Sequence, residues 1–301
     1  MTGLGALIRR NTKLYFKDKG MFFSSLITPV ILLVLYATFL KKVFDESFRS
    51  ALAAAGATLA DGVLNGVVGG QLVSSLLAVS CVTVAFCSNL LMIKDKTSGA
   101  RHDLTISPVR PATMAMGYYL ATLASTLIVT FVAAAVCLGY LACVGWYLTA
   151  GDVLELLLDV FLLTMFGTAL SSCINFWLTT DGQASAVGTI VSAGYGFICG
   201  AYMPISNFGD GLQKALSFLP GTYGTSLLRN HTMGGAFAEM ERLGFPREVV
   251  EAIRDSVDCN IYFFDHRVTS GEMYLILCGS IVVLVGLYVL INRLAGRRGA
   301  R

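Results

Sequence analysis

The sequence predicts an all-α integral membrane protein with six transmembrane helices, and three observations support this fold class. Of the 301 residues, 55% are hydrophobic and only 14% are charged, whereas soluble domains carry roughly 25% charged residues. The mean hydropathy is +0.69. Six apolar runs along the chain are each long enough for the roughly 20 residues of helix that cross a bilayer. The expected partner of most of the surface is therefore the lipid bilayer.

An amphipathic segment precedes the first span. Residues 4–20 place leucines and an isoleucine largely on one helical face and Arg9, Arg10 and Lys13 largely on the other. This pattern predicts an interfacial elbow helix, although a basic flank that only fixes topology explains the same residues. The first span follows at residues 21–40. Lysines follow it in place of a small-residue cleavage site, which favours a membrane anchor.

The next four spans are expected at residues 64–93, 113–146, 155–178 and 183–203. The run that contains the third span is too long for one upright crossing, and we interpret it as one tilted helix, with two crossings as the alternative. Glycines at a spacing of four open the second span. This spacing is typical of close helix packing, and a substrate path lined by the same helix is the functional alternative. The sixth span is expected at residues 273–292.

The basic residues predict the orientation. Lys and Arg are frequent before the first span, in the loop after the second and after the sixth, whereas the other connections hold few of them or are acidic. Because cytoplasmic loops carry an excess of Lys and Arg, both termini are expected in the cytoplasm of a multi-pass cell-membrane protein. This requires an even number of spans. The asymmetry also explains the net charge of +3 without a nucleic-acid partner.

Residues 204–268 predict an external re-entrant hairpin and cap. An apolar stripe between Pro204 and Pro220 indicates one short amphipathic helix, and a second short helix is expected from near Thr222. Neither is expected to span the membrane. Pro246 then begins a segment that predicts a surface helix. Its expected buried residues are Val249, Val250, Ile253 and Val257.

Three acidic residues lie on one face near the outer end of the fourth span. Asp152, Glu155 and Asp159 recur at i, i+3 and i+7. Acids at membrane depth often mark a site, so a cation-binding role competes here with a solvated helix start. Seven of the eight cysteines fall within spans, where packing explains them.

The sequence lacks the motifs of the common catalytic and metal sites. It contains no GxxxxGK[ST] phosphate loop, no HExxH and no GxSxG, and its three histidines, at positions 102, 231 and 266, are far apart. We therefore expect no enzymatic activity, no metal site and no cofactor bound by this chain. A protein that binds or moves something, driven by a gradient or by a partner, is the remaining class.

The loop at residues 97–110 is the one substantial short cytoplasmic connection. Ser98 and Gly99 can begin a helix, residues 100–106 suffice for about two turns, and Pro108 and Pro111 prevent it from continuing into the third span. The result is a short rigid protrusion that a partner's groove could bind. An ordinary basic loop that only fixes topology is the alternative.

Four segments in this order resemble the type-2 ATP-binding-cassette exporter permeases. The loop carries a G…SPV-R pattern. GFICGAYMPIS resembles the family's glycine-rich end of the fifth helix, FLPGTYGTSLLR resembles the segment that follows it, and RRNTKLYFKDKG resembles the amino-terminal elbow. The chain departs from many members directly after Gly99, where Ala100, Arg101 and His102 replace a threonine and an acidic residue.

The resemblance implies a half-transporter. Two such permeases, identical or similar, would pair around a path between their second and fifth helices, and a separate cytoplasmic ABC ATPase subunit would bind ATP and Mg. The resemblance assigns ATPase coupling to nine residues: Gly99, Arg101, His102, Asp103, Leu104, Ile106, Ser107, Pro108 and Arg110. It assigns elbow contact to Arg9, Arg10 and Lys13, and the outer gate to Pro204, Ile205, Pro220, Tyr223 and Arg229.

The expected function is ATP-driven export of a hydrophobic or amphiphilic compound, such as a drug, an antibiotic or a lipid-like molecule. A secondary transporter driven by an ion gradient is one alternative, and it would be favoured by buried acids at mid-membrane. A membrane assembly factor that transports nothing is the other. Substrate identity does not follow from the sequence, because apolar export pockets accept unrelated compounds.

Overall fold

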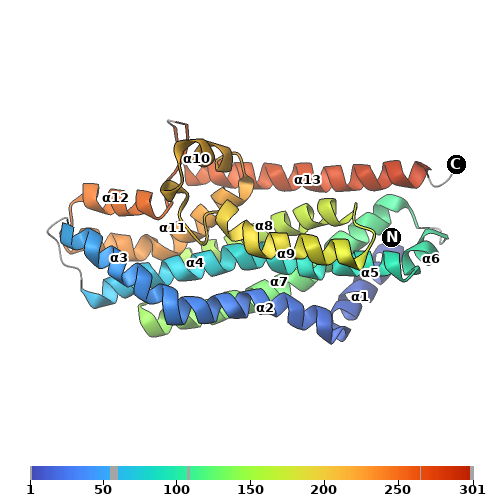
Figure 1. Cartoon of the computed structure of the whole chain (residues 1–301), viewed down its shortest axis with the longest axis horizontal. Coiled ribbons are helices and arrows are strands. Elements are labelled where there is room, and N and C mark those ends of the chain that lie inside the picture. The colour runs from blue at the N-terminus through green and yellow to red at the C-terminus, as the bar shows by residue number, and fades with distance from the viewer. Residues whose placement is uncertain (1, 55–59, 107–108, 265, 299–301) are drawn as a thin grey trace.

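The computed structural model describes residues 2–54, 60–106, 109–264 and 266–298. Within them the protein is an elongated bundle whose long helices run along one axis (Figure 1). The first half contains α1 (Thr2–Lys17), α2 (Lys19–Leu35), a π-helical stretch (Tyr36–Leu40), α3 (Lys41–Ala54), α4 (Asp61–Ser88), α5 (Leu90–Thr97), α6 (Ala100–Ile106) and α7 (Pro111–Val144).

The second half begins with α8 (Ala150–Asn175) and α9 (Asp181–Ile198). A 3-10 turn (Ile205–Asn207), α10 (Asp210–Leu216), α11 (Pro220–Arg242) and α12 (Arg247–Ser256) follow. The chain ends with an antiparallel hairpin of β1 (Ile261–Phe263) and β2 (His266–Val268), and with α13 (Ser270–Arg298). This hairpin was not expected in an all-α chain. Its register pairs Ile261 with Val268, and both side chains are buried.

The membrane-spanning helices agree in part with the sequence prediction. Within the described residues, four helices are long and apolar enough to cross a membrane: Asp61–Thr97, Pro111–Val144, Ala150–Asn175 and Ser270–Ala295. They correspond to the expected second, third, fourth and sixth spans, and the third is one helix. The bent pair of α1 and α2 passes the same test only when its two parts are taken together. α9 lies where the fifth span was expected, but its first turn includes Asp181 and Gln183, which lower its apolar character.

The amino-terminal helices form a sharp bend. α1 and α2 meet at 74°, and the side chain of Asp18 accepts a hydrogen bond from the backbone N–H of Met21 at the start of α2. An aspartate at this position satisfies a helix N–H group that lacks an intrahelical partner. Residues 4–20, for which an interfacial elbow helix was predicted, thus contain α1, the bend at Asp18 and the start of α2.

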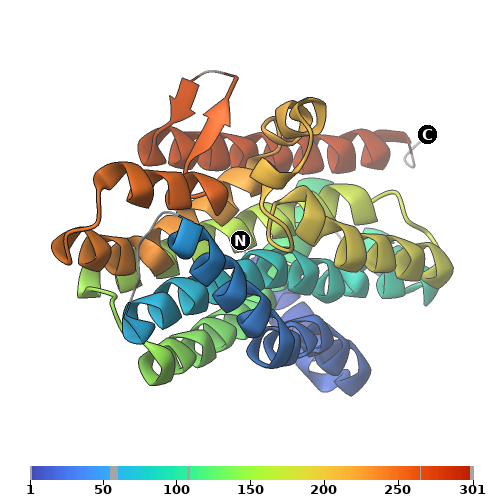
Figure 2. The same ribbon diagram turned by 60° about the vertical axis from the view of Figure 1, so that its left-hand side comes forward.

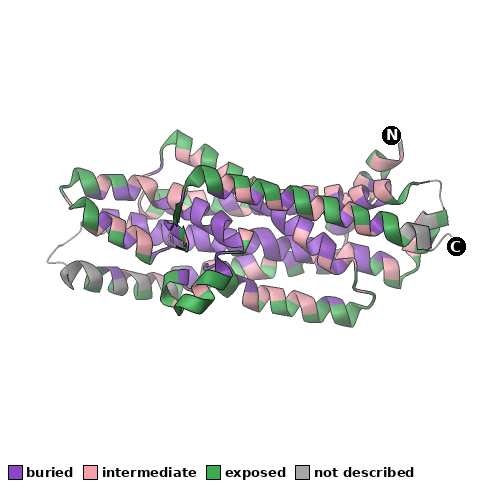
Figure 3. Cartoon of the chain, turned by 90° about the horizontal axis from the view of Figure 1, so that it is seen from above, coloured by how far each residue is buried: buried purple, intermediate pink, exposed green. Residues whose placement is uncertain are grey.

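α4 forms the centre of the bundle. Nearly all of its side chains are buried, and it packs against α2, α7, α8 and α11. Gly70 permits the contact with α11, because a Cβ there would lie 2.8 Å from the carbonyl oxygen of Thr232. Close packing thus accounts for this glycine. Figure 3 shows buried residues along the bundle axis and exposed ones along the outer faces.

The region after α9 differs from the prediction in one main respect. α10 is short as expected, but α11 is not, since it runs for 23 residues and packs against α4 and α8. The small residues on the first half of α11, such as Gly221 and Gly224, let it lie against Tyr195 and Leu163, and tertiary packing extends the helix. The predicted surface helix is confirmed as α12, which buries Val250 and Ile253.

α1 begins and α13 ends at the same end of the bundle, and α6 lies there too (Figure 1). We refer to this as the α6 end. The opposite end holds α3, α12 and the carboxyl-terminal part of α11 (Figures 1 and 2).

Candidate functional site

The first candidate site is a buried polar cluster between α11 and the segment that follows α9, which we call the clamp. Arg229 of α11 is 1% exposed. Its Nη1 donates to Oδ2 of Asp258 at 3.0 Å, and its Nη2 donates to the carbonyl oxygen of Gly200 at 2.5 Å. A buried guanidinium needs such partners, because an unpaired buried charge costs several kcal/mol.

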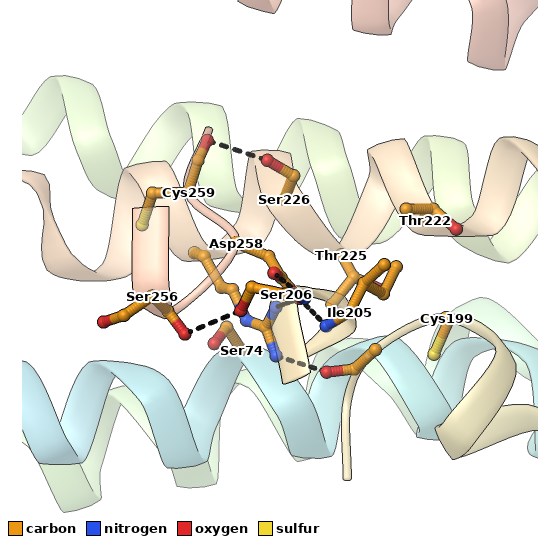
Figure 4. Close-up of polar contacts among 12 residues, drawn as sticks. Ser74, Cys199, Ile205, Ser206, Thr222, Thr225, Ser226, Ser256, Asp258 and Cys259 are labelled. Carbon is orange, nitrogen blue, oxygen red and sulfur yellow. Dashed lines mark hydrogen bonds and ion pairs between the residues drawn. The ribbon is translucent and has the colours of Figure 1, made fainter. Parts of the chain in front are cut away.

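Asp258 extends the clamp to the 3-10 turn. Its carboxylate accepts from the backbone N–H of Ile205 at 2.5 Å and from that of Ser206 at 3.1 Å (Figure 4). One ion pair thus connects α11, the chain after α12 and the chain after α9. Gly200 has a φ of +75°, and a Cβ there would lie 2.9 Å from Ile205, so glycine suits this crowded turn.

Two further hydrogen bonds join α10 to α11. The hydroxyl of Tyr223 donates to the carbonyl oxygen of Ser217 at 2.5 Å, and that of Thr222 donates to the carbonyl oxygen of Leu216 at 3.0 Å. Pro220 is the first residue of α11, where its missing N–H costs no helical hydrogen bond. Pro204, directly before the 3-10 turn, is buried. The structure therefore places all five predicted gate residues in or beside one connected region.

The second candidate site joins α8, α11 and α13 through Asp159, which is fully buried. Nδ1 of His231 lies 2.5 Å from Asp159 Oδ2, and the hydroxyl of Tyr274 donates to Asp159 Oδ1 at 2.7 Å. Nε2 of His231 lies 3.1 Å from a carboxylate oxygen of Glu155. One imidazole therefore bridges two carboxylates, and the arrangement favours its charged form.

The titration of His231 follows from these neighbours. Burial alone lowers the pKa of His231, but the hydrogen bond to Asp159 and the charges of Asp159, Glu155 and Asp152 outweigh it and raise the pKa above 6.5. Asp152 itself accepts from the backbone N–H and hydroxyl of Thr149 and so caps α8. Within the described residues, no group of three or more His, Cys, Asp or Glu side chains is placed to hold a metal ion.

The third candidate site is the base of α6. Arg10 of α1 forms a two-pronged ion pair with Asp95, at 2.6 and 3.1 Å, and the hydroxyl of Tyr118 donates to the same carboxylate at 2.7 Å. Nζ of Lys96 donates to three carbonyl oxygens at the end of α8: those of Asn175, Phe176 and Leu178. α5, which leads into α6, is thus fixed to α1, α7 and α8.

α6 extends from this base as the two-turn helix that the sequence predicted. Gly99 precedes it with a φ of +82°, a conformation that favours glycine. The guanidinium of Arg101 lies 5.6 Å from the ring centroid of Phe176, whereas Ile106 is 73% exposed. The exposed coupling residues of the described chain also include His102, Asp103 and Arg110, and Leu104 is half-buried. Ser107 and Pro108 lie outside the described residues.

The three predicted elbow residues do not all lie on one exposed surface. Arg9 and Lys13 are exposed, while Arg10 faces the bundle and pairs with Asp95. Because α1 buries only one face, Arg9 points to the exposed face and the adjacent Arg10 points to the bundle.

Two grooves lie along the long helices. One, of about 800 Å³, lies between α2 and α9, and its mainly apolar lining also includes hydroxyls; among its residues are Thr28, Ile31, Thr189 and Phe197. α4 contributes only Cys87 to it. The other groove, of about 470 Å³, lies between α8, α9 and α13 and is almost wholly apolar.

The partners of the buried charged residues could not be identified from the sequence. Asp258, Asp95, His231 and Tyr274 each complete a cluster with a residue 23 to 115 positions away. Their only sequence signal was weak: Asp95 stood between two lysines, and His231 was one of three isolated histidines. Long-range pairing of this kind depends on the tertiary fold.

One family of known proteins matches most of the chain. Residues 2–232 match the family model described as ABC-2 type transporter. No curated protein matches the chain.

Proposed function

Because this chain belongs to the ABC-2 type transporter family, we propose that it is the permease subunit of an ATP-driven exporter of hydrophobic or amphiphilic compounds. Permeases of this family are membrane components that pair with an ATP-binding subunit. The partner ATPase binds ATP and Mg, and hydrolysis there drives transport out across the cell membrane. The permease pairs with a second copy or with a similar permease, and both its termini are cytoplasmic.

The observation that supports this most directly is the placement of α6. It follows α5, and α4 and α5 together run from Asp61 to Thr97 through the centre of the bundle. A force applied by an ATPase to the exposed residues of α6, with Ile106 and Asp103 among them, is therefore transmitted to the core helix. Rigid-body shifts of packed helices are one way in which a partner drives a conformational change.

The α2–α9 groove fits the substrate class. Its lining combines apolar side chains with serine and threonine hydroxyls from both helices, and such a surface suits a compound that is mainly apolar with a few polar groups. In this proposal the groove of each permease faces the other across the path. The clamp around Arg229 forms the outer gate, because it fixes the segment after α9 to α11.

The test is reconstitution of the full chain with a candidate ABC ATPase in vesicles, followed by measurement of ATPase stimulation and dye export. Ile106→Asp is expected to abolish both while leaving the fold intact, because the side chain is 73% exposed. Leu243→Asp, at the opposite end and 50% exposed, is the matched control and should retain both. Unchanged export in Ile106→Asp would contradict coupling through α6.

The same vesicles separate this function from the alternatives. Export that needs ATP and persists when an ionophore collapses the ion gradient supports the proposal. Export that stops when the ionophore is added and does not depend on ATP would instead indicate a secondary transporter. A complex that transports no compound in the panel and leaves ATPase activity unchanged would favour an assembly factor.

A further inference from the structure

Three phenylalanines from two segments form an exposed cluster, which we call the aromatic cluster. Phe218 follows α10, and Phe263 and Phe264 belong to the β1–β2 hairpin. Ring centroids lie 5.1 Å apart for Phe218 and Phe263 and 5.0 Å apart for Phe263 and Phe264. Phe218 is 63% exposed and Phe264 55% exposed. Contiguous exposed apolar surface is a feature of protein and membrane interaction sites.

The aromatic cluster lies at the level where a membrane span begins. β2 ends at Val268, and the candidate span starts at Ser270. In Figures 1 and 2 the hairpin stands off the side of the bundle, beside the start of α13. Leu275, one and a half turns into α13, is 74% exposed, as expected of a helix that faces lipid. The cluster therefore projects sideways at the membrane surface.

A cation accompanies the aromatic rings. Nζ of Lys214 on α10 lies 5.9 Å from the ring centroid of Phe264, and the Lys214 side chain is exposed. Aromatic residues concentrate at the boundary between headgroups and acyl chains, and the long side chain of a lysine near that boundary lets its ammonium reach the headgroup region. Three aromatic rings beside one lysine match a phospholipid surface better than an apolar protein partner. Such a partner would bury the lysine ammonium without a counter-charge.

The hairpin turn adds an independent observation. Phe264 has a φ of +54°, a left-handed conformation that is uncommon for bulky residues and costs of order 1–3 kcal/mol. Glycine or asparagine would form such a turn with less strain. A phenylalanine that is both strained and exposed points to a role outside the protein interior.

We propose that the aromatic cluster inserts into the interfacial region of the phospholipid leaflet at the start of α13, with Lys214 facing lipid phosphate. Insertion holds α10 at the membrane surface. Phe218 directly follows Ser217, whose carbonyl oxygen accepts a hydrogen bond from Tyr223 of α11. Insertion of the aromatic cluster therefore also restrains the connection between α10 and α11, and α11 carries Arg229 of the clamp.

The test uses tryptophan quenching by brominated lipid in the full chain. The two native tryptophans are first removed as Trp146→Phe and Trp177→Phe, and Phe264→Trp then supplies the single emitter. The protein is reconstituted in vesicles of phosphatidylcholine and phosphatidylglycerol, with or without bromine on the upper acyl chain. We expect Phe264→Trp to lose most of its emission in brominated vesicles.

Leu243→Trp is the matched control, because Leu243 is 50% exposed at the turn between α11 and α12, and its emission should not change with bromination. Phe218→Trp repeats the test from the other segment in case Phe264→Trp does not fold. The proposal is overturned if bromination quenches the tryptophans at positions 264 and 218 no more than the one at position 243. This holds whether their emission wavelength indicates a ring in water or a ring covered by protein. The test needs no ATPase, so its outcome is independent of the proposed transport function.

Discussion

Arg229 and Asp258 form a buried ion pair, with 3.0 Å between Nη1 and Oδ2 and with 1% and 5% of the two side chains exposed. The pair connects α11 to the segment after α12, and Nη2 of the same arginine donates to the carbonyl oxygen of Gly200, just after the end of α9. Three parts of the chain that are 29 to 58 residues apart therefore depend on one side chain and its counter-ion.

Removal of one member of this pair should destabilise the protein strongly. Arg229→Met leaves the Asp258 carboxylate buried without its cation, at an expected cost of about 3–5 kcal/mol. Thermal unfolding in detergent measures the effect. The double variant Arg229→Met with Asp258→Asn should recover part of the loss, because no unpaired charge remains.

An exposed ion pair provides the comparison. Arg242 and Glu239 lie 2.6 Å apart, but the arginine side chain is 74% exposed. Arg242→Met should lower the thermal midpoint far less than Arg229→Met does, because exposed ion pairs contribute little to stability. Equal losses in Arg229→Met and Arg242→Met would show that the clamp does not support the fold.

The His231 cluster predicts a dependence of stability on pH. The folded-state pKa of His231 is raised above 6.5, so its contribution is fully present below that value and is lost as the pH rises through the folded-state pKa. The thermal midpoint should therefore fall as the pH is raised above 6.5. His231→Gln should flatten this part of the curve, whereas His266→Gln should not, since His266 is exposed.

A methyl group added at Gly70, where α4 contacts α11, should destabilise the protein. In Gly70→Ala the new Cβ would lie 2.8 Å from the backbone carbonyl oxygen of Thr232, and overpacking of this kind costs about 1–3 kcal/mol. Gly139→Ala on α7 is the control, because a Cβ there meets no atom within 4 Å. Thermal unfolding compares the two variants, and a Gly70→Ala protein as stable as Gly139→Ala would be inconsistent with this packing.

Two neighbouring arginines on α1 should behave differently. Arg10→Met removes the cation from Asp95, which is only 5% exposed, so the thermal midpoint should drop. Arg9→Met should leave the midpoint unchanged, because Arg9 is exposed. If an ATPase partner binds the elbow through Arg9, this second variant should instead lower the affinity of the complex, measured by co-purification.

Much of the fold follows from local properties of the chain. The periodicity and length of the apolar runs predicted the helices now labelled α7, α8 and α13, and proline and glycine positions predicted α6 and α12. The sequence predicted only a short helix from near Thr222, whereas α11 runs for 23 residues. Its small residues pack closely on α4 and α8, and this tertiary support outweighs a weak local preference for a long helix.

The sequence alone determined that this protein is a helical membrane protein with a short two-turn helix after its second span, because hydropathy and helix-stopping residues act over a few turns of chain. Only the tertiary structure decided how the charges are used. It turned Arg10 inward to Asp95, joined Asp159 to His231 across 72 residues, and paired Arg229 with Asp258. The physical reason is that a buried charge is stable only beside a counter-charge, and the identity of that neighbour depends on which distant segments the fold brings together.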